Sequence, residues 1–221
     1  MIHGGFWRAR YGRKLMRPVS RDLAERGWAA WNIEYRRLGR LSGGGWPCTL
    51  DDVAAAVDHL AELPHHAGER LDLGRVVTIG HSAGGHLAAW VAARQAVALD
   101  AEPRVRVSAV VSQAGVVDLR LAWELRLSKG VVPQFLGGTP EELPDRYALA
   151  SPVERVPLGV PALLVHGGRD DIVPPVVSER YLEAARAAGD ECELRLLADE
   201  DHFGHIDPAN PLWQAVVEWL A

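Results

Sequence analysis

The sequence predicts an α/β fold in which a mostly parallel sheet is flanked by helices. Short apolar runs alternate along the chain with longer stretches whose apolar residues recur at helical spacing. The runs are short and largely apolar, which is typical of parallel strands that are buried on both faces. The chain has 221 residues, of which 48% are hydrophobic and 24% charged, and this is enough to bury one substantial core.

Five apolar runs are expected to form strands, and five stretches around them are expected to form helices. The strands are residues 28–35, 75–80, 107–112, 162–167 and 192–197. The helices are residues 15–26, 49–63, 84–97, 176–188 and 212–220. Thr49 is a suitable N-cap for the second helix, and Gly27 and Gly189 stand where the first and fourth helices end.

Residues 119–157 differ from the rest of the chain. They are rich in Pro, Gly and isolated apolar residues, among them Trp123 and Phe135. We expect this stretch to form an irregular helical cap over one end of the sheet. Residues 1–221 are then a single domain that carries this cap as an insertion.

Composition excludes several classes of partner and compartment. The net charge is −5, and the 24 basic residues are scattered among 29 acidic ones, so no basic stripe suggests nucleic acid or an anionic membrane surface. Cys48 and Cys192 are far apart, which argues against a disulfide framework or a cysteine-rich metal site. No apolar run approaches the roughly 20 residues of a membrane span, and the N-terminus lacks the apolar stretch of a signal peptide. We therefore expect a cytoplasmic protein.

The strongest motif is Gly80-His81-Ser82-Ala83-Gly84, which lies between a predicted strand and a predicted helix. This matches G-x-S-x-G in the context that a nucleophile elbow needs, where a sharp turn exposes the serine hydroxyl at the end of the strand. A purely structural glycine turn is the alternative. A phosphate site is disfavoured, because neither the lysine of a P-loop nor a G-x-G-x-x-G pattern is present.

A serine nucleophile requires a base, and the base requires a group that orients it. Asp170 and Asp171 both follow the predicted strand 162–167, at the edge of the sheet where ligands of α/β proteins bind, and Asp118 is a third candidate. His202 and His205 follow the last predicted strand, and His202 lies closer to the strand end.

The segment that contains these two histidines, "DEDHFGH", also raises the alternative of a metal site. Its H-x-x-H spacing lacks the i, i+4 arrangement and the glutamate of H-E-x-x-H, so we expect no metal. Four other histidines, His59, His65, His66 and His86, lack such a cluster of candidate ligands and are expected at surface or helix positions.

The chain opens with "MIHGGFW", and its two adjacent glycines can form a loop that presents N–H groups to a ligand. A tetrahedral oxyanion needs such donors. The N–H groups of Gly5 and Phe6 are candidates, together with that of Ala83 after the serine. The side chains of Phe6 and Trp7 would form part of an apolar wall beside this site.

Together, these motifs resemble the α/β-hydrolase superfamily, and within it the branch of acetyl-esterase/lipase-like carboxylesterases and arylformamidases. The matching segments are "HGGFW", "EYRRLG" with "GGWP", "GHSAGGHLA", "FLGGTPEELPDRYALASPVERV", "VHGGRDDIVP" and "DHF". These segments cover nearly the whole chain. They are specific for the fold and for the catalytic residues, although not for the substrate. The resemblance implies a triad of Ser82, Asp170 and His202, and it is the reason for preferring Asp170 over Asp171.

The chain departs from this family at its beginning. Similar proteins carry two strands and most of a third before the H-G-G loop, whereas here the third is reduced to Met1 and Ile2. We expect an α/β-hydrolase sheet that lacks these strands, and either a start of translation upstream of Met1 or a sheet that folds in reduced form.

The resemblance implies a serine hydrolase that cleaves a small carboxylic ester through an acyl-enzyme. Arylformamidase activity, a peptidase of the prolyl-oligopeptidase-like type and a catalytically silent binding protein are the alternatives. Trp7, Trp46, His81 and Trp123 are the candidate pocket residues. The expected partner is a small ester or formamide. No cofactor is expected, and the sequence leaves open whether the chain forms a homodimer.

Overall fold

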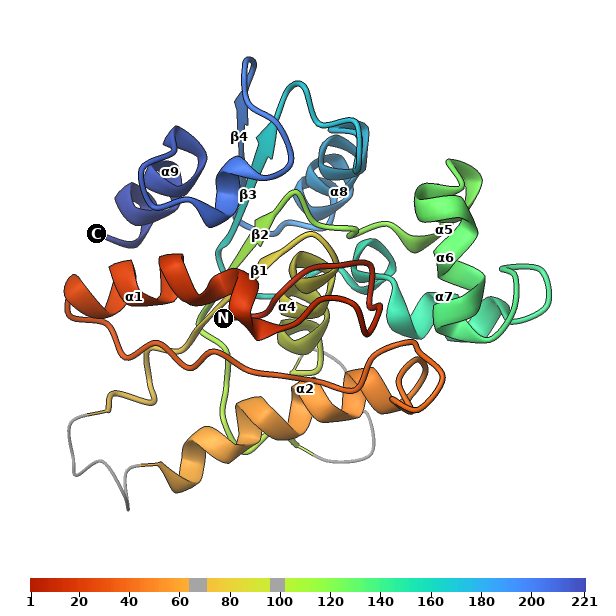
Figure 1. Ribbon diagram of the computed structural model, residues 1–221, viewed down its shortest axis with the longest axis horizontal. Coiled ribbons are helices and arrows are strands. Elements are labelled where there is room, and N and C mark those ends of the chain that lie inside the picture. Colours follow the sequence, from red (N-terminus) through yellow and green to blue (C-terminus); the bar gives the residue numbers. More distant parts are fainter. Residues whose placement is uncertain (64–70, 96–101) are drawn as a thin grey trace.

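The centre of the protein is a parallel four-stranded sheet, seen in the computed structural model, which describes residues 1–63, 71–95 and 102–221 (Figure 1). The strands lie in the order β1-β2-β3-β4. They are β1 (Val77–His81), β2 (Ala109–Gln113), β3 (Ala162–Gly167) and β4 (Cys192–Leu197). Because all neighbours pair in parallel, the carboxyl ends of the strands lie along one edge of the sheet.

Helices surround this sheet. The α-helices are α1 (Arg17–Glu25), α2 (Cys48–Asp58), α4 (Ala83–Ala93), α5 (Leu119–Glu124), α6 (Leu127–Leu136), α7 (Pro144–Ala150), α8 (Val176–Ala187) and α9 (Pro211–Leu220). The 3₁₀ turns are η1 (Arg13–Met16), η2 (His59–Glu62), η3 (Pro152–Arg155) and η4 (Gly204–Ile206).

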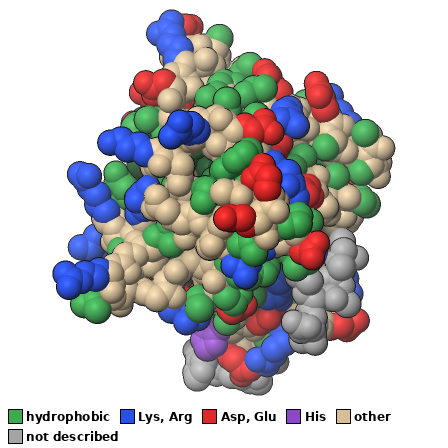
Figure 2. All heavy atoms as spheres, turned by 90° about the vertical axis from the view of Figure 1, so that its right-hand side faces the viewer, with side chains coloured by type: hydrophobic (Ala, Val, Ile, Leu, Met, Phe, Trp, Pro, Cys, Tyr) green, Lys and Arg blue, Asp and Glu red, His purple; other side chains and the backbone are tan. Residues whose placement is uncertain are grey.

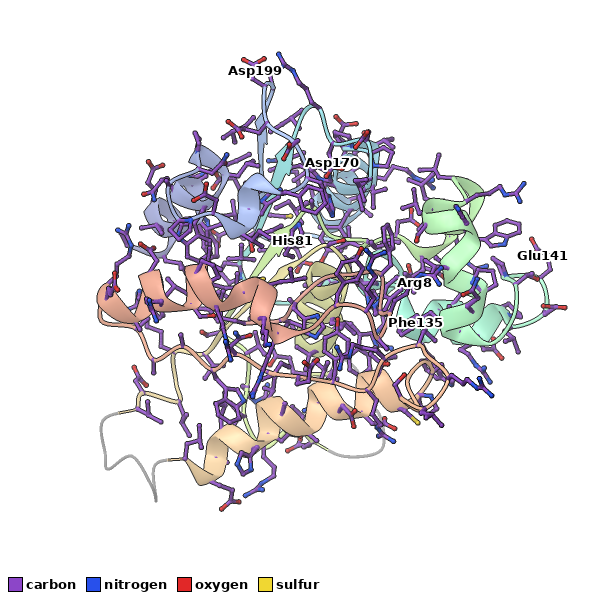
Figure 3. All side chains as sticks on the ribbon, viewed as in Figure 1. Arg8, His81, Phe135, Glu141, Asp170 and Asp199 are labelled. Atoms are coloured by element: carbon purple, nitrogen blue, oxygen red, sulfur yellow. The ribbon has the colours of Figure 1, made fainter. Side chains whose placement is uncertain are left out.

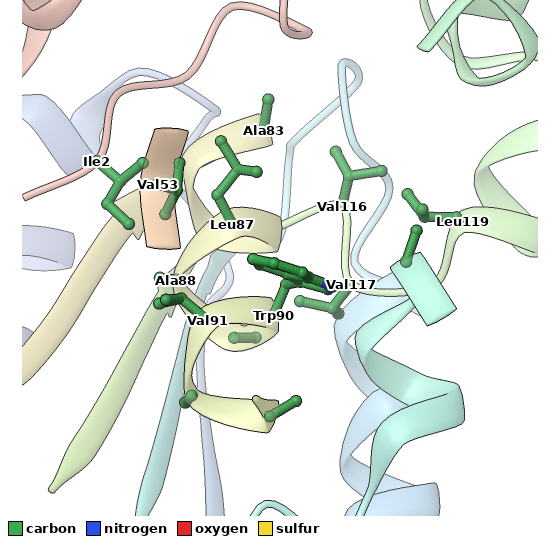
Figure 4. Packing of buried hydrophobic residues seen from close by; sticks show 14 of the residues in the cluster. Ile2, Val53, Ala83, Leu87, Ala88, Trp90, Val91, Val116, Val117 and Leu119 are labelled. Atoms are coloured by element: carbon green, nitrogen blue, oxygen red, sulfur yellow. The ribbon is translucent and has the colours of Figure 1, made fainter. Parts of the chain in front are cut away.

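The two faces of the sheet bury two separate hydrophobic clusters. Side chains alternate between faces along a strand, so Val110 joins one cluster and Val111 the other. Helices α1 and α9 cover the face of Val111, whereas α2, α4 and α8 cover the face of Val110. On that second face, Leu87 and Trp90 of α4 pack among buried side chains of the sheet and of the loops near it (Figure 4). Helix cover on both faces explains why the strands are apolar throughout.

Four of the five predicted strands are confirmed, but the strand predicted at residues 28–35 is wrong. The segment is assigned to no strand. Ile33 donates a backbone hydrogen bond to Met1 O (3.1 Å), and Ile2 forms an isolated bridge with Gly80. Two residues are too short a partner for a hydrogen-bond ladder. A cavity of about 640 Å³, lined largely by apolar residues, lies between this segment and β1.

The predicted helices are confirmed with changes at their ends. The helix expected at residues 49–63 is α2 followed by the 3₁₀ turn η2, and residues 96 and 97 of the one expected at 84–97 lie outside the described residues.

The expected N-cap role of Thr49 is wrong, because α2 begins one residue earlier at Cys48. Thr49 instead accepts a hydrogen bond from Gly45 N–H (2.9 Å) and donates one to Arg36 O (2.5 Å). It therefore anchors the loop that precedes the helix.

Residues 119–157 contain α5, α6, α7 and η3, which lie to one side of the sheet (Figure 1). Figure 2 shows the molecule from that side, with acidic and basic side chains scattered among hydrophobic and neutral ones. Ser128, Lys129 and Gly130 at the start of α6 have positive φ angles, so the first turn of this helix is kinked. Among the described helices, none is both long and apolar enough to cross a bilayer.

Candidate active site

Ser82 occupies the turn between β1 and α4 in a backbone conformation that few residues adopt. Its φ is 57° and its ψ is −121°, outside the regions open to ordinary side chains. A Cβ atom on Gly80 would overlap the backbone of Gly84, and one on Gly84 would overlap the carbonyl of Ile2. Both positions therefore require glycine. The Ser82 N–H donates to Gln113 O at 2.8 Å, which ties the turn to β2.

Asp170 and His202 form a buried pair at the same edge of the sheet. Asp170 follows β3 and His202 follows β4, and their side chains meet because these strands are neighbours. His202 Nδ1 lies 2.6 Å from Asp170 Oδ2, so the ring N–H donates to the carboxylate. The two residues are only 4% and 5% exposed. A short, buried contact of this kind fixes both the ring orientation and the tautomer of the histidine.

The Asp170 carboxylate has further hydrogen-bond donors. Its Oδ1 accepts from the backbone N–H groups of Ile172 (2.9 Å) and Val173 (2.8 Å), and His166 Nε2 lies 3.2 Å from Oδ2. Burial raises the pKa of Asp170, but the hydrogen bonds from His166 and His202 outweigh it and hold the pKa well below its usual range. The carboxylate therefore stays ionised at neutral pH. No role for His166 was expected from the sequence, although this histidine belongs to the "VHGGRDDIVP" segment.

His202 lies beside the residue that precedes the serine. His81 Nε2 donates to the backbone carbonyl of His202 at 2.8 Å, and the two ring centroids are 4.6 Å apart. Burial, with a further contribution from the nearby charge of His202, lowers the pKa of His81 to about 3, so this ring is neutral. Figure 3 shows His81 close to Asp170. Among the described residues, Ser82 Oγ has no hydrogen-bond partner, and such bonds are often formed only when substrate binds.

The rival acid and base candidates occupy other environments. Asp171 is exposed. Asp118 caps α5, where its Oδ1 accepts from Leu121 N–H at 2.9 Å. His205 is fully buried, its ring lies 5.6 Å from that of His81, and burial lowers its pKa well below the ordinary value. Among the described residues, Asp170 and His202 are the candidate pair in direct contact.

The loop at residues 4–7 touches the serine turn directly. A Cβ atom on Gly4 would lie 2.9 Å from Ser82 Cβ, so only glycine permits this approach. Gly5, Phe6 and Trp7 have φ angles of 107°, 48° and 55°, and positive φ is strained for the two aromatic residues. Three successive residues with positive φ give the loop a sharply curved backbone.

The candidate oxyanion donors are unpaired in this arrangement. Within the described residues, the N–H groups of Gly5 and Phe6 donate to no acceptor. Ala83 is the first residue of α4, and its N–H has no partner inside the helix. The loop and the helix start therefore both offer free donors next to Ser82, in a region where the helix dipole also favours negative charge.

Contacts outside the loop hold it in place. His3 Nε2 lies 2.6 Å from Glu34 Oε1, and the Tyr35 hydroxyl donates to His3 O at 2.7 Å. Trp7 is stacked on Phe135 of α6, with ring centroids 4.3 Å apart. The roles of Glu34 and Tyr35 were not expected from sequence. Their segment "EYRRLG" was noted only as part of a resemblance, and nothing local in it indicates a contact with His3.

The candidate pocket residues differ in exposure. Trp7 and His81 are 0% and 3% exposed, so Trp7 supports the loop from behind and His81 packs against His202. Trp46 and Trp123 are half-buried, and the Arg146 guanidinium lies 5.6 Å from the Trp46 ring centroid. The two half-buried tryptophans are thus the candidates with surface available to a ligand.

The other histidines do not form a metal site with the residues described here. No group of three or more His, Cys, Asp or Glu side chains in residues 1–63, 71–95 and 102–221 is arranged to hold a metal ion. His59 is exposed, and His86 is buried in α4, where its Nε2 donates to Ala150 O at 2.9 Å. His65 and His66 lie outside the described residues.

Comparisons with known proteins show the family and the fold of the chain. The model of the BD-FAE family matches residues 1–184. Esterase LipQ of Mycobacterium tuberculosis is 29% identical over 196 residues, which are 85% of this chain and 45% of the relative. Esterase LipC of the same organism is 30% identical over 206 residues, or 84% of this chain and 47% of the relative. The chain thus spans less than half the length of these relatives.

Solved structures show the same architecture. The crystal structure of esterase B from Lactobacillus rhamnosis is 26% identical, with a TM-score of 0.80 that covers 99% of this chain and 72% of that one. The sheet topology, the serine turn and the family match agree with one another. The chain belongs to the BD-FAE family and has the α/β-hydrolase fold.

Proposed function

We propose that the protein is a serine hydrolase that cleaves a small carboxylic ester through an acyl-enzyme intermediate. The observation that carries this proposal is the 2.6 Å contact between His202 Nδ1 and an ionised Asp170, beside the strained turn that presents Ser82. The esterase names of two relatives support the reaction class, and they belong to proteins about twice as long.

In the proposed first half-reaction, Ser82 Oγ attacks the acyl carbonyl carbon while His202 Nε2 accepts the hydroxyl proton. Asp170 stabilises the imidazolium that forms and keeps its ring in place. The carbonyl oxygen becomes negatively charged and receives hydrogen bonds from the N–H groups of Gly5, Phe6 and Ala83. His202 then returns the proton to the leaving alkoxide, and the acyl group stays on Ser82.

In the second half-reaction, water replaces the alcohol. His202 accepts a proton from this water, which attacks the acyl carbonyl in the same oxyanion site. Collapse of the second tetrahedral intermediate breaks the bond to Ser82 Oγ and returns the proton to it. The products are a carboxylic acid and the original enzyme. Trp46 and Trp123 supply aromatic surface for the substrate, and α5, α6 and α7 cover this side of the site.

Replacement of the serine tests the proposal. Ser82→Ala is expected to lower kcat for short-chain aryl esters by roughly 10⁴-fold or more. A fluorophosphonate probe should label the wild-type chain at Ser82 and should not label the variant. Ser108→Ala is a suitable control, because Ser108 Oγ bonds Val76 O at the far end of the sheet.

A substrate panel then decides between the alternatives. Short-chain aryl esters, longer acyl chains and N-formylkynurenine are compared with the same enzyme preparation. If the enzyme prefers N-formylkynurenine, its proposed activity becomes that of an arylformamidase instead of an esterase. Folded wild-type protein that takes up no fluorophosphonate and cleaves none of these substrates would contradict the proposal and favour a catalytically silent binding protein.

A further inference from the structure

His166 is a fully buried histidine whose three contacts have no place in the mechanism above. It belongs to β3, and its ring lies between α8 and the acid of the proposed triad. Its Nδ1 is 2.8 Å from Ser178 Oγ. Its Nε2 is 2.8 Å from Val173 O and 3.2 Å from Asp170 Oδ2. Both ring nitrogens are therefore engaged, and one of them faces the catalytic carboxylate.

The chemistry of these partners fixes the tautomer of His166. A backbone carbonyl only accepts hydrogen bonds, so Nε2 must carry the hydrogen that points towards Val173 O. The same hydrogen is shared with Asp170 Oδ2 at the longer distance. In the neutral ring Nδ1 is then an acceptor, and the Ser178 hydroxyl donates to it. Ser178 is itself fully buried, so water does not compete for this bond.

These contacts saturate the Asp170 carboxylate. Oδ1 has two backbone donors, from Ile172 and Val173, and Oδ2 has two ring donors, from His166 and His202. A carboxylate offers about four lone-pair positions. With all four occupied, the carboxylate cannot rotate away from His202 without leaving a buried donor unpaired, which is unfavourable.

We propose that His166 is a positioning residue, held by Ser178, that locks the Asp170 carboxylate in the orientation His202 requires. The proposal rests on the function assigned above, because it concerns the acid of that triad. It extends the buried chain of hydrogen bonds from His202 and Asp170 through His166 to Ser178 on α8. Helix α8 thereby takes part in orienting the general base without touching the substrate.

The surroundings of Asp170 make the effect visible in a pH profile. His166 faces the carboxylate from β3, His202 from the loop after β4, and His81 and His205 lie behind His202. Burial keeps the pKa of both His81 and His205 below the ordinary value, so these two rings stay neutral where the enzyme is assayed. The chain neighbours Arg169 and Asp171 are exposed. Loss of a donor to Oδ2 leaves the negative charge of the carboxylate less compensated and so favours the imidazolium form of His202. The acid limb of kcat/KM then moves to higher pH.

Three variants test the proposal. His166→Leu removes both ring nitrogens and is expected to lower kcat by roughly 10²-fold with little change in KM. His166→Gln can place an amide N–H near the former Nε2, so it should recover much of this loss. Ser178→Ala frees the ring and should lower kcat by a smaller factor, roughly 10-fold or less. Ser20→Ala is the matched control, because Ser20 Oγ in α1 donates a comparable buried hydrogen bond to Met16 O at the end of η1.

The pH profile separates positioning from simple support of the fold. His166→Leu and Ser178→Ala should show the acid limb of kcat/KM displaced to higher pH. Ser20→Ala should show the wild-type profile. Variants of residues 166 and 178 that lose thermal stability but keep the wild-type kcat and acid limb would overturn the proposal.

A spectroscopic measurement makes the result independent of turnover. The His202 Nδ1–H that points at Asp170 should give a low-field proton resonance, and this resonance should persist in Ser82→Ala. Ser178→Ala and His166→Gln should shift it, and Ser20→Ala should not. An unchanged resonance in the first two would reject the positioning role. If Ser82→Ala instead keeps full activity, the proposed function fails and the resonance still tests the hydrogen-bond chain.

Discussion

The two halves of the site are built in different ways. On the side of Asp170, side chains are held by hydrogen bonds: the carboxylate has four donors, and its backbone needs no unusual conformation. On the side of Gly5, three successive residues have positive φ, and the N–H groups of Gly5 and Phe6 are free. On the acid side every acceptor position of the carboxylate has a donor, whereas on the loop side the backbone is strained and the N–H donors have no acceptor.

This difference follows from what each half must do. In the proposed mechanism the acid keeps one orientation throughout the reaction, so filling every acceptor site of the carboxylate is advantageous. The proposed oxyanion donors stay unpaired until negative charge develops, and a curved backbone held by packing achieves that at a cost in conformational energy. Substitutions on the two sides should therefore lower kcat for different reasons, through the tautomer of His202 on the acid side and through the position of the N–H donors on the loop side.

The largest effect is expected from Asp170→Asn. Asparagine keeps the shape and the contacts of Oδ1 but places an amide N–H against His202, which favours the wrong tautomer. We expect kcat to fall by roughly 10⁴-fold with the fold intact. Asp171→Asn, at the exposed neighbour, is the control and should keep wild-type kinetics. Steady-state kinetics and circular dichroism check both, and an Asp170→Asn enzyme within tenfold of wild type would exclude Asp170 as the acid.

The next effect is expected from Gly5→Ala on the loop side. Gly5 has a φ of 107°, and an added Cβ would also overlap the Tyr11 side chain. We expect kcat to fall by roughly 10²- to 10³-fold, the range for loss of one oxyanion donor, with little change in KM. Gly189→Ala is matched to it, because Gly189 has a φ of 89° with no atom within 4 Å of its added Cβ.

Both glycine variants carry the backbone cost of positive φ, and Gly5→Ala carries the overlap with the Tyr11 side chain in addition. The ratio of their kcat values then isolates the displacement of the loop. Equal kcat values in Gly5→Ala and Gly189→Ala would show that the loop does not supply oxyanion donors.

A pH-dependent stability effect is expected from His86, which packs edge-on against Trp7 behind the loop. Burial lowers the pKa of His86 from its ordinary 6.5 to about 4. Between these two pH values the unfolded chain binds a proton that the folded chain does not, so stability falls as pH falls through this window. His86→Gln should reduce this slope by about 1.4 kcal/mol per pH unit.

Urea denaturation at pH 7, 6, 5 and 4 measures that slope. At pH 7 the contribution of His86 to this slope should be small, because the histidine is then neutral in the folded chain and mostly neutral in the unfolded chain. His81 contributes in the same direction over a wider window, since its folded pKa is about 3. Asp170, with its lowered pKa, adds a loss of stability only below the ordinary range of an aspartate, near pH 4 and lower. A slope that His86→Gln leaves unchanged would contradict the assignment.

Much of the site could be predicted from the sequence, because local rules determine it. The turn at Ser82 needs small neighbours at Gly80 and Gly84, and this spacing is visible in the sequence. The ends of parallel strands meet at one edge, so placing Asp170 after β3 and His202 after β4 brings them together once the strand order is correct.

The parts that could not be predicted depend on contacts between distant segments. The strand expected at residues 28–35 has suitable composition, but strand formation needs a partner of similar length, and Met1 and Ile2 provide only two residues. His166 looks like an ordinary strand residue until the fold of α8 brings Ser178 to its ring. The cap assigned to Thr49 fails because its hydroxyl has a stronger use at Arg36 O.

The smallest effect is expected from Trp7→Phe, and it asks what holds the strained loop. The Trp7 ring stacks on Phe135, while its Nε1 is buried without an acceptor in the described residues. The backbone of the loop is separately bound, since Leu38 N–H donates to Trp7 O (2.6 Å) and Arg8 N–H donates to Gly5 O (2.9 Å). Phenylalanine keeps a stacking ring and removes the unpaired donor, so the change in unfolding free energy should be below about 1.5 kcal/mol.

Trp7→Ala separates the two sources of restraint. It removes the ring and should cost about 3–5 kcal/mol of stability. If the backbone bonds to Leu38 and Gly5 set the loop conformation, the folded fraction of Trp7→Ala keeps most of its kcat. If packing against Phe135 sets it, kcat falls together with stability, as in Gly5→Ala. Because the positive φ angles of Phe6 and Trp7 are unfavourable by themselves, two hydrogen bonds are a weak restraint, and we expect the second outcome for Ala and near wild-type turnover for Phe.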